Sequence, residues 1–485
     1  MNVAVEKKET PPPEPEKKSN DTLKKWAIVI GIGLVLWFIP APEGCEPLGW
    51  KLFAIFVATI AGFIIAPIPM GPMAILSLSL CAILNIAGIK DLLVGFSNTT
   101  VWLVVCAFFL ARGFIKTGLA RRISLGIVKA IGTNTLRLGY AITLTDLVFG
   151  PAMPSVTARG GAIVYPLIQG LNLVFDSKPG PTARRIGAYL FQIEQHATCI
   201  VSAMFITAMA SNPLAVALAQ DTAGVEITWM GWMVAALVPG LLCILVFPYV
   251  LYKIYTPELT ATPEAPEMAR NELQKMGPMS QKEKIMLGVF FGCLALWMTG
   301  TWTGINATTV TLLASAVLLI TAVITWKDCL AEGGAWDLMV WLAVLITLAG
   351  LLSKLGMVSW IAETVGGMLG GLNWVATLIV MVVFYLYVHY FFASLTAHIT
   401  AFYAPLLAIA VFAGAPAMLA ALVLGFFGNI CGSLTHYGSG PAPILFGAGF
   451  VDQGTWWKLG FIIVTLNSII FLGSGAFWWK ILGLY

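Results

Sequence analysis

Residues 154–160, PSVTARG, and residues 393–399, ASLTAHI, are two imperfect copies of one short sequence. Each copy reads Ser-x-Thr-Ala followed by a basic residue, which is Arg159 in the first copy and His398 in the second. Both copies lie inside long apolar segments, where an ionisable side chain is costly unless it faces a cavity or a partner. The two copies therefore mark a candidate functional site.

The repetition extends well beyond these two segments. The tripeptide VWL occurs at 101–103 and again at 340–342, and the dipeptide KD occurs at 90–91 and again at 327–328. These copies follow one another in the same order and at nearly the same spacing. A collinear series of this kind is typical of a duplicated half, so the chain is predicted to contain two related halves.

The composition indicates an integral membrane protein. Of the 485 residues, 59% are hydrophobic and only 10% are charged, whereas a soluble domain has about 25% charged residues. We therefore expect an all-α polytopic membrane protein, and the net charge of +4 gives no reason to expect a nucleic-acid partner. The eight cysteines show neither paired nor metal-ligand spacing, so we expect no metal and no cofactor.

Composition along the chain divides it into four segments. Residues 1–25 combine charged residues with a proline-rich run and are predicted to form a disordered cytoplasmic tail. The first half covers 26–253, a polar cytoplasmic linker covers 254–284, and the second half covers 285–485. The linker is expected only to connect the two halves.

Apolar segments of about 20 residues predict about 11 transmembrane helices. They are expected at 26–39, 51–69, 72–87, 98–116, 187–210, 229–252, 285–300, 306–326, 336–353, 416–446 and 456–483. The tenth of these is interrupted. Two further segments, 119–129 and 357–369, are predicted to lie in the plane of the membrane surface.

The segments that flank the first copy are too short to cross a membrane. Residues 136–150 and 162–175 correspond to about 21 Å of helix each, against a hydrocarbon core of about 30 Å. Prolines and glycines separate the two segments at the tip. Each half is therefore predicted to hold a re-entrant hairpin, at 136–175 in the first half and at 372–412 in the second.

Positive charges predict the orientation of the chain. The chain has 27 lysines and arginines. If the N-terminus lies in the cytoplasm, only Lys51, Lys90, Lys354 and Lys480 fall on the outer side, Arg159 is buried, and all the others lie on the cytoplasmic side. This bias follows the positive-inside rule. We expect a multi-pass protein of a bacterial inner (plasma) membrane, with inverted repeats whose hairpins enter from opposite sides and bring their tips together near mid-bilayer.

The tips carry the chemistry of an anion site. A broken helix at this depth presents free backbone N–H groups with partial positive charge. The predicted substrate-binding hydroxyls are Ser155, Thr157, Ser394 and Thr396, and the predicted charge-compensating residues are Arg159 and His398. Two opposed donor sets without an acid fit a solute with two carboxylates. In the alternative, the hydroxyls bond back to helix carbonyls and Arg159 pairs with Asp146 or Glu194.

Two further interruptions follow the hairpins. The first, ASNP at 210–213, contains Ser211, Asn212 and Pro213, and its alternative interpretation is a turn in an outer loop. The second, GSLTHYGSGP at 432–441, is rich in glycine and hydroxyls. Both are expected to turn backbone carbonyls and hydroxyls toward the tips. In the second interruption Thr435 is predicted to bind substrate, and His436, Gly438 and Pro441 are predicted to support the loop.

Five stretches carry a likeness to a known family. They are GFSNTTVWL at 95–103, GLARRI at 118–123, the tip at 154–161, FAS at 392–394 and the stretch 435–443. With them, residues 26–485 resemble the divalent anion:sodium symporter family, in its dicarboxylate and tricarboxylate translocator branch of the 2-oxoglutarate/malate and citrate/succinate type. The resemblance implies a homodimeric elevator, in which a transport domain holding both tips slides against a scaffold.

The resemblance also implies roles for the tips. In the family, Ser-Asn-Thr signatures hold substrate carboxylates with their side chains and help to bind sodium with their backbone. They map onto Ser155, Thr157, Ser394 and Thr396, with Val156 and Leu395 in place of asparagine. Arg159 and His398 stand where sodium would be needed, as in members that look like sodium-independent exchangers.

We therefore expect secondary transport of a di- or tricarboxylate anion, by sodium-independent exchange for a counter-anion. A permanently positive carrier is costly to move empty, and a bound anion neutralises it. Sodium-coupled dicarboxylate symport is the alternative. A membrane-embedded hydrolase is a distant alternative, because the four histidines lack a His-x-x-x-His spacing and no serine lies in a nucleophile elbow. An enzyme is not expected.

Overall fold

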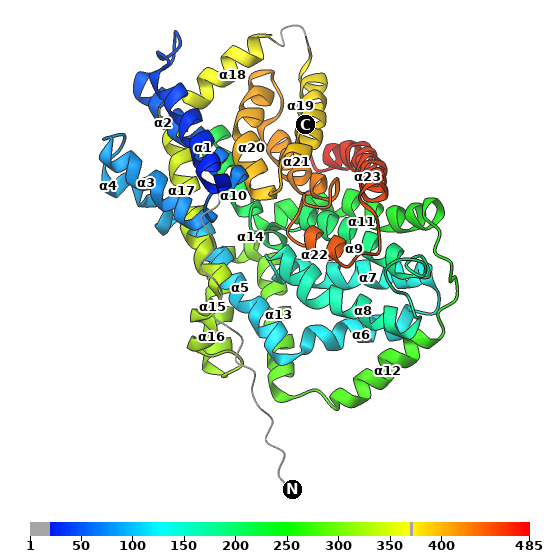
Figure 1. Ribbon diagram of the computed structural model, residues 1–485. Coiled ribbons are helices and arrows are strands. Elements are labelled where there is room, and N and C mark those ends of the chain that lie inside the picture. Colours follow the sequence, from blue (N-terminus) through cyan, green and yellow to red (C-terminus); the bar gives the residue numbers. More distant parts are fainter. Residues whose placement is uncertain (1–19, 369–371) are drawn as a thin grey trace.

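The computed structural model describes residues 20–368 and 372–485, and these residues are predominantly helical (Figure 1). A single β-type contact within them joins Asn134 and Ala261. The all-α fold expected from the composition is confirmed. Residues 1–19 of the expected tail and residue 369 of the second surface segment lie outside the described residues. Residues 20–25, which the sequence assigned to the tail, instead form the first turns of a helix.

The first half contains long helices, a helical hairpin and a helix that is broken and resumes. Its elements are α1 (Asn20–Phe38), α2 (Pro47–Ile65), α3 (Met70–Ile83), α4 (Ile89–Leu92), η1 (Val94–Ser97), α5 (Thr99–Thr117), α6 (Leu119–Ile131), α7 (Thr135–Phe149), η2 (Gly150–Ala152), η3 (Ala158–Val164), α8 (Tyr165–Val174), α9 (Gly187–Met204), η4 (Ile206–Ala208), α10 (Asn212–Ala223) and α11 (Trp229–Ile254). The helix α10 was not expected, because the sequence predicted a break at the end of the helix at 187–210 and no further helix directly after it.

The linker contains α12 (Glu264–Met276), and the second half repeats the order of the first. Its elements are α13 (Gln281–Met298), α14 (Gly300–Thr303), α15 (Ala307–Ile320), α16 (Trp326–Leu330), α17 (Gly333–Lys354), α18 (Met357–Met368), α19 (Trp374–Val388), η5 (His389–Phe391), α20 (Leu395–Phe412), α21 (Ala417–Ile430), η6 (Cys431–Ser433), α22 (Ala442–Gly447) and α23 (Gln453–Ile481). The α-helices from α3 to α11 correspond, one by one, to those from α15 to α23.

Both hairpins begin with the same local structure. The side chain of Asn134 accepts a hydrogen bond from the Arg137 N–H at the start of α7, and that of Asn373 accepts one from the Ala376 N–H at the start of α19. An asparagine cap satisfies a backbone N–H that the first turn of a helix leaves free. The first arm of each hairpin is therefore started by an equivalent asparagine.

Seven helices among the described residues are long and apolar enough to cross a membrane. They include both arms of the second hairpin, Trp374–Phe391 and Leu395–Phe412, with 18 residues each. Other expected spans are shorter, and α3 and α15 have 14 residues each. The expected total of about 11 crossings therefore stays a prediction.

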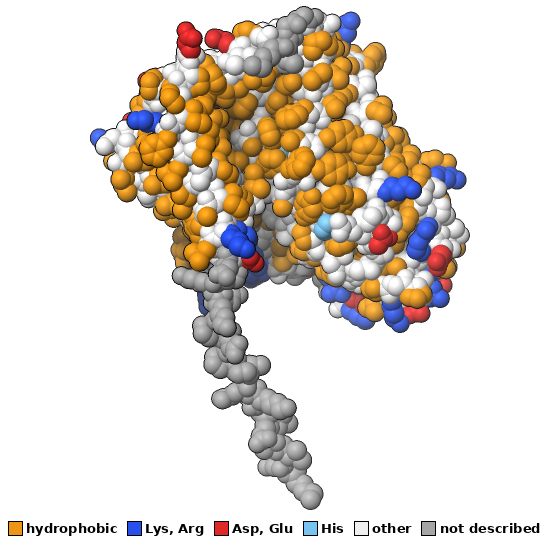
Figure 2. All heavy atoms as spheres, turned by 45° about the horizontal axis from the view of Figure 1, so that its top comes forward, with side chains coloured by type: hydrophobic (Ala, Val, Ile, Leu, Met, Phe, Trp, Pro, Cys, Tyr) orange, Lys and Arg blue, Asp and Glu red, His pale blue; other side chains and the backbone are white. Residues whose placement is uncertain are grey.

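Large apolar side chains cover much of the outer surface. Figure 2 shows one face that is mostly apolar, with charged side chains gathered toward its margins. Phe38, Ile83 and Phe477 are 77%, 74% and 73% exposed. Extensive exposed apolar surface is unfavourable in water and fits contact with lipid.

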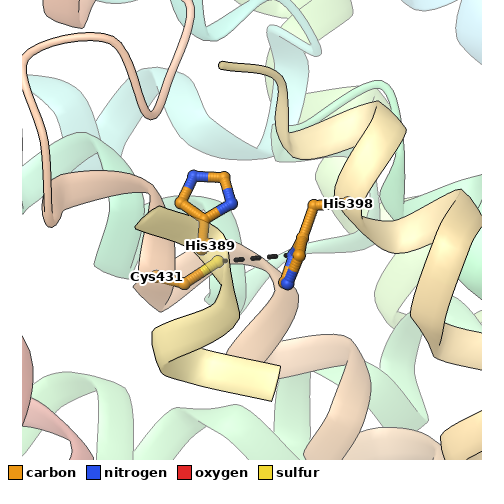
Figure 3. A group of neighbouring side chains, drawn as sticks. All are labelled: His389, His398 and Cys431. Atoms are coloured by element: carbon orange, nitrogen blue, oxygen red, sulfur yellow. Dashed lines mark hydrogen bonds between the residues drawn. The ribbon is translucent and has the colours of Figure 1, made fainter. Parts of the chain in front are cut away.

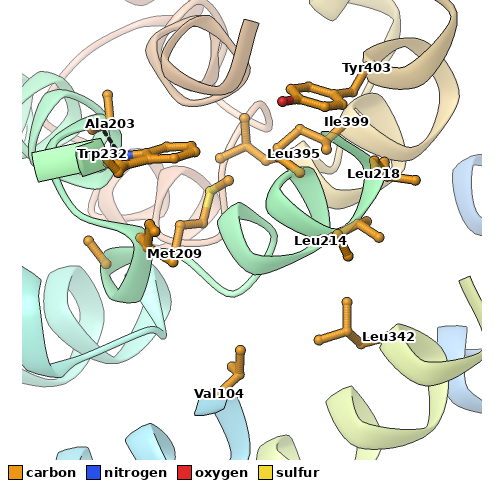
Figure 4. Close-up of a cluster of buried hydrophobic side chains, with 14 of the residues drawn as sticks. Val104, Ala203, Met209, Leu214, Leu218, Trp232, Leu342, Leu395, Ile399 and Tyr403 are labelled. Carbon is orange, nitrogen blue, oxygen red and sulfur yellow. Dashed lines mark hydrogen bonds between the residues drawn. The ribbon is translucent and has the colours of Figure 1, made fainter. Parts of the chain in front are cut away.

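A buried apolar cluster joins the two halves around the second hairpin. Its members include Val104, Ala203, Met209, Leu214, Leu218, Trp232, Leu342, Leu395, Ile399 and Tyr403 (Figure 4). Within this cluster α20 packs on α10, so the return arm of the second hairpin rests on the resumed helix of the first half. The indole N–H of Trp232 donates to the Ala203 carbonyl at 2.9 Å.

The last helix, α23, lies directly against the interruption of the second half. A Cβ added at Gly460 would lie 2.8 Å from the Ser433 carbonyl oxygen and would also collide with the Leu434 carbonyl oxygen. Backbone atoms of a buried loop cannot move away as a flexible side chain can. Gly460 therefore allows this close approach.

Gly460→Ala is expected to destabilise the protein by about 1–3 kcal/mol, the usual cost of overpacking. Thermal unfolding of the detergent-purified protein measures this as a lowered Tm. Gly473→Ala is the matched control, because Gly473 lies on the same helix and a Cβ there would meet nothing within 4 Å. Equal Tm values for the two variants would contradict the close approach.

Candidate functional site

The two tips have the same hydrogen-bonded geometry. The Ser155 hydroxyl oxygen accepts from the Ala158 N–H at 3.1 Å, and the Ser394 hydroxyl oxygen accepts from the Ala397 N–H at 3.3 Å. Each serine thus caps the return arm of its hairpin and keeps its own O–H proton as a donor. After the first cap the return arm begins as a π-helical stretch, η3, a distortion that is frequent at functional sites.

The second tip meets the interruption of the first half. The hydroxyls of Thr396 and Ser211 lie 2.5 Å apart, which is a hydrogen bond between the two halves. Ser211 is 1% exposed, at the start of α10. The structure thus brings a predicted tip hydroxyl and a predicted supporting residue together.

The first tip meets the interruption of the second half. A Cβ added at Gly440 would collide with the Thr157 hydroxyl, and one added at Gly160 would lie 2.8 Å from Cβ of Pro441. Thr157 itself is exposed. Each tip is therefore packed against the interruption of the other half, although no hydrogen bond between the two tips occurs among the described residues.

Asn212 satisfies the broken end of α9. Its amide donates to the carbonyls of Ser202 and Phe205 at 2.8 and 3.0 Å, and its own oxygen accepts from the Asn429 amide at 2.8 Å. Carbonyls at a helix end must be bonded when no water is available. Asn212 is 0% exposed, so it lies inside the protein and not in an outer loop. Pro213, at the first turn of α10, follows it.

Asn429 is a residue that sequence analysis missed. It lies at the end of α21, and it connects the two interruptions through Asn212. The sequence signal was an isolated amide in the apolar run ALVLGFFGNIC at 421–431. An amide in such a run needs a buried partner.

The interruption of the second half is held by side chains from both halves. Gln195 of α9 donates to the Gly432 carbonyl at 3.1 Å, and His436 accepts from the Trp457 indole at 2.9 Å. The Gly438 carbonyl lies 2.7 Å from Nε2 of His389. Thr435 is 0% exposed, and its hydroxyl has no hydrogen-bond partner among the described residues. This hydroxyl remains free to bind another group.

Arg159 is 0% exposed and its charge is offset inside the protein. Its Nε lies 3.0 Å from Oδ1 of Asp146, which is also 0% exposed. The other guanidinium N–H groups donate to the carbonyls of Met153, Thr198 and Ala208 and to the hydroxyls of Thr198 and Ser202. The pairing with Asp146 that the sequence offered as an alternative is therefore present. Direct charge compensation of a solute by Arg159 stays a prediction that this geometry does not favour.

His398 is also 0% exposed and lies one turn after the second tip. Its Nε2 lies 2.9 Å from the Tyr385 carbonyl, and its ring stacks on that of Tyr385 with centroids 4.2 Å apart. Its Nδ1 lies 3.7 Å from the Cys431 sulfur. The side chain is directed into the protein and away from the Thr396–Ser211 contact.

One acidic residue near the first tip has no hydrogen-bond partner among the described residues. Both carboxylate oxygens of Glu194 are buried without a hydrogen bond, and a Cβ added at Gly160 would lie 3.2 Å from Oε1. A buried carboxylate in this state either carries a proton or meets a cation. Sequence analysis had considered Glu194 as a partner for Arg159 or for a buried histidine, and not as a cation ligand.

A cavity of about 550 Å³ lies beside the start of α10. Its lining includes Pro213, Gln220, Asp221 and Glu226 from the first half and Asn306 from the second. It therefore reaches the interruption of the first half from one side, and its acidic residues would not attract an anion.

Helices that break inside an apolar protein, and hairpin tips that carry hydroxyls, define a polytopic membrane transporter. Residues 20–485 match the family described as the sodium:sulfate symporter transmembrane region. The chain therefore belongs to this family of divalent anion:sodium symporters, as the sequence resemblance indicated.

Relatives of known name are similar over nearly the whole chain. YflS of Bacillus subtilis (strain 168), named as a candidate malate transporter, is 49% identical over 97% of this chain and 98% of its own. Chloroplastic dicarboxylate transporter 1 of Arabidopsis thaliana is 43% identical over 98% of this chain and 86% of its own. Inner membrane protein YbhI of Escherichia coli (strain K12) is 36% identical over 95% and 98%. Because the family consists of symporters and the relatives from Bacillus subtilis and Arabidopsis thaliana are named as transporters, the chain is not an enzyme, and the hydrolase alternative was wrong.

A solved structure shares the fold. The crystal structure of the YdaH transporter of Alcanivorax borkumensis, described as having an unusual topology, matches with a TM-score of 0.53. The match covers 97% of this chain and 99% of that chain at 12% sequence identity. At this identity the likeness shows the fold alone.

Asp146→Asn is expected to lower the free energy of unfolding by about 3–5 kcal/mol, because it leaves the Arg159 charge buried without its partner. The measurement is thermal unfolding in detergent. The double variant Asp146→Asn/Arg159→Gln should recover part of the loss. Arg121→Gln is the control, since the pair of Arg121 and Glu272 is exposed and should contribute little. An unchanged Tm for Asp146→Asn would contradict the conclusion that Asp146 offsets the buried charge of Arg159.

Proposed function

We propose that this protein exchanges a di- or tricarboxylate anion for a counter-anion, without sodium, by an elevator mechanism. The relatives named as malate and dicarboxylate transporters support the substrate class. The proposed substrate contacts are Ser155, Thr157, Ser394, Thr396 and the unpartnered hydroxyl of Thr435. The serine-capped return arms add backbone N–H groups, so the site binds anions through donors and helix N-termini.

The observation that carries sodium independence is the position of the Arg159 guanidinium. It bonds the carbonyl oxygens of Met153, beside the first tip, and of Ala208, in the interruption after α9, as well as that of Thr198 inside α9. Carbonyl oxygens of this kind are the ligands that a sodium ion takes at a broken helix. Because the Arg159 guanidinium already occupies these carbonyl oxygens, they cannot form a binding site for a coupled sodium ion.

The second half is arranged in a similar way. Nε2 of His398 bonds the Tyr385 carbonyl, and Nε2 of His389 bonds the Gly438 carbonyl. These carbonyls are therefore already satisfied by protein N–H groups. With no sodium to couple, we propose that uphill movement of one anion is driven by the gradient of another, which is exchange.

Sodium-coupled symport remains the second candidate because of Glu194. Its buried carboxylate lies beside Gly160 of the first tip and has no hydrogen-bond partner among the described residues. A carboxylate in that position could hold a cation that Arg159 does not replace. The two candidates therefore differ in one measurable requirement, which is sodium on the side of uptake.

The wider arrangement is also part of the proposal. We place the N-terminus in the cytoplasm and the protein in the bacterial inner (plasma) membrane, which the lysine and arginine bias and the name of the relative YbhI support. We propose a homodimer, surrounded by lipid, because the family resemblance implies one. The inverted repeats allow the two hairpins to enter from opposite faces.

Malate counterflow in preloaded liposomes tests the proposal. Uptake of labelled malate is expected to be equal in sodium and in choline medium, and to need an anion inside. Uptake that requires sodium would establish the symport alternative.

Thr396→Val and Ser211→Ala are expected to reduce counterflow at least tenfold, since each removes a hydroxyl from the contact between the second tip and the first-half interruption. Thr400→Ala is the matched control, because Thr400 lies one turn further along α20 and its hydroxyl bonds back to the Thr396 carbonyl. If counterflow were unchanged in all three variants, the hydroxyls of Thr396 and Ser211 would not be part of the site.

A further inference from the structure

Three potential metal ligands converge behind the second tip. They are His389 of η5, His398 of α20 and Cys431 of η6, all 0% exposed (Figure 3). One ligand atom from each lies within 4.8 Å of the other two. Sequence analysis expected no metal, because these residues are far apart in the chain and match no ligand spacing.

Hydrogen bonds fix both imidazole rings in the form that binds a metal. Nε2 of His389 faces the Gly438 carbonyl at 2.7 Å, and Nε2 of His398 faces the Tyr385 carbonyl at 2.9 Å. A carbonyl can only accept, so each Nε2 carries the proton. In the neutral ring Nδ1 then holds a free lone pair. Metal-binding histidines are oriented in this way by outer partners.

The Nδ1 lone pairs of His389 and His398 form no strong hydrogen bond within the described residues. Nδ1 of His389 has no hydrogen-bond partner there, and Nδ1 of His398 has only the Cys431 sulfur at 3.7 Å. A buried acceptor without a partner is costly. Two imidazoles and a thiol therefore lie close together, and the Cys431 thiol has only long contacts, to Nδ1 of His398 at 3.7 Å and to the Gly428 carbonyl at 3.6 Å.

We propose that His389, His398 and Cys431 bind one copper(I) ion. Thiolate and imidazole ligands favour soft ions such as copper(I) and also accept zinc. The surroundings decide between them, because the rings of Tyr385, Phe392 and Phe402 pack around His398 with centroids within 5.9 Å of its ring. A copper(I) ion and one thiolate are neutral together, whereas zinc would leave a buried positive charge.

Binding requires one proton transfer and a small movement. The Cys431 thiol releases its proton to solvent as the sulfur–copper bond forms, and copper keeps its oxidation state. With bond lengths like those of zinc, about 2.0 Å to nitrogen and about 2.3 Å to sulfur, a three-coordinate ion places its ligand atoms about 3.5–3.7 Å apart. The separation of 3.7 Å between Cys431 and His398 is already close to this value. His389 has to approach by about 1 Å.

The three ligands come from three elements around the second tip. An ion between them would fasten η5, which precedes Ser394, and α20, which contains Thr396, to the interruption that begins at η6. We infer that copper(I) binding arrests transport. This consequence rests on the proposed function, whereas the binding itself does not.

Binding is measured on the full-length protein in detergent, under reducing conditions, by competition with a coloured copper(I) chelator. The wild type is expected to take one equivalent of copper(I) more from the chelator than Cys431→Ser does. Cys243→Ser is the matched control, since Cys243 is an equally buried free thiol, and it should withdraw as much as the wild type. His389→Gln should lose the same equivalent, and size-exclusion profiles identify variants that fail to fold.

Equal copper(I) binding by the wild type, Cys431→Ser and His389→Gln would overturn the site. Zinc bound at this site in preference to copper(I) would overturn the choice of ion. Copper(I) is expected to lower malate counterflow at least tenfold in the wild type and not in Cys431→Ser. Copper(I) binding without a loss of counterflow would overturn only the inference that copper(I) arrests transport. If no preparation showed malate counterflow, the proposed function would be overturned, and the binding result would still stand.

Discussion

Backbone polar groups that leave a helix inside the membrane must find hydrogen-bond partners within the protein. The structure meets this constraint at each of its four interruptions, which are the two hairpin tips and the two broken helices. Ser155 and Ser394 cap the tips, Asn212 bonds the end of α9, and Gln195 bonds the loop after α21. Gln195 belongs to the first half and the loop after α21 to the second, so this loop depends on both halves.

The same constraint explains how an anion site can exist in an apolar interior. Thr396 contacts Ser211, and Thr157 lies against Gly440, so each tip faces the interruption of the opposite repeat. Asn429 and Asn212 join the two interruptions to each other. Donors are thereby held in place by a network that needs no water, while the free hydroxyl protons remain available to a solute.

Much of the fold could be predicted from the sequence. The repeated Ser-x-Thr-Ala stretches, the short flanking segments and the polar interruptions located the hairpins and breaks, because apolar length and helix-breaking residues act locally. The end of α9 was placed too late and α10 was missed, because Asn212 and Pro213 begin a helix whose stability comes from packing on α20. That packing joins residues far apart in the chain.

The site was predicted less completely, for a physical reason. Residue type indicated that Arg159 needed a partner, but only the fold shows that Asp146 meets it and that the guanidinium fills a set of carbonyls. The approach of His389, His398 and Cys431 likewise depends on three elements that meet in space. Spacing in the sequence carries no information about such a meeting.

We propose that the second tip closes on the interruption of the first half to form the anion site. The most direct measurement is disulfide formation, in membranes, between Ser211→Cys and Thr396→Cys, with linked peptides identified by mass spectrometry. We expect rapid linkage on mild oxidation, slowed by saturating malate, and no linkage in the control pair Ser474→Cys and Thr396→Cys. Failure of the first pair to link in a protein that still transports malate would contradict it.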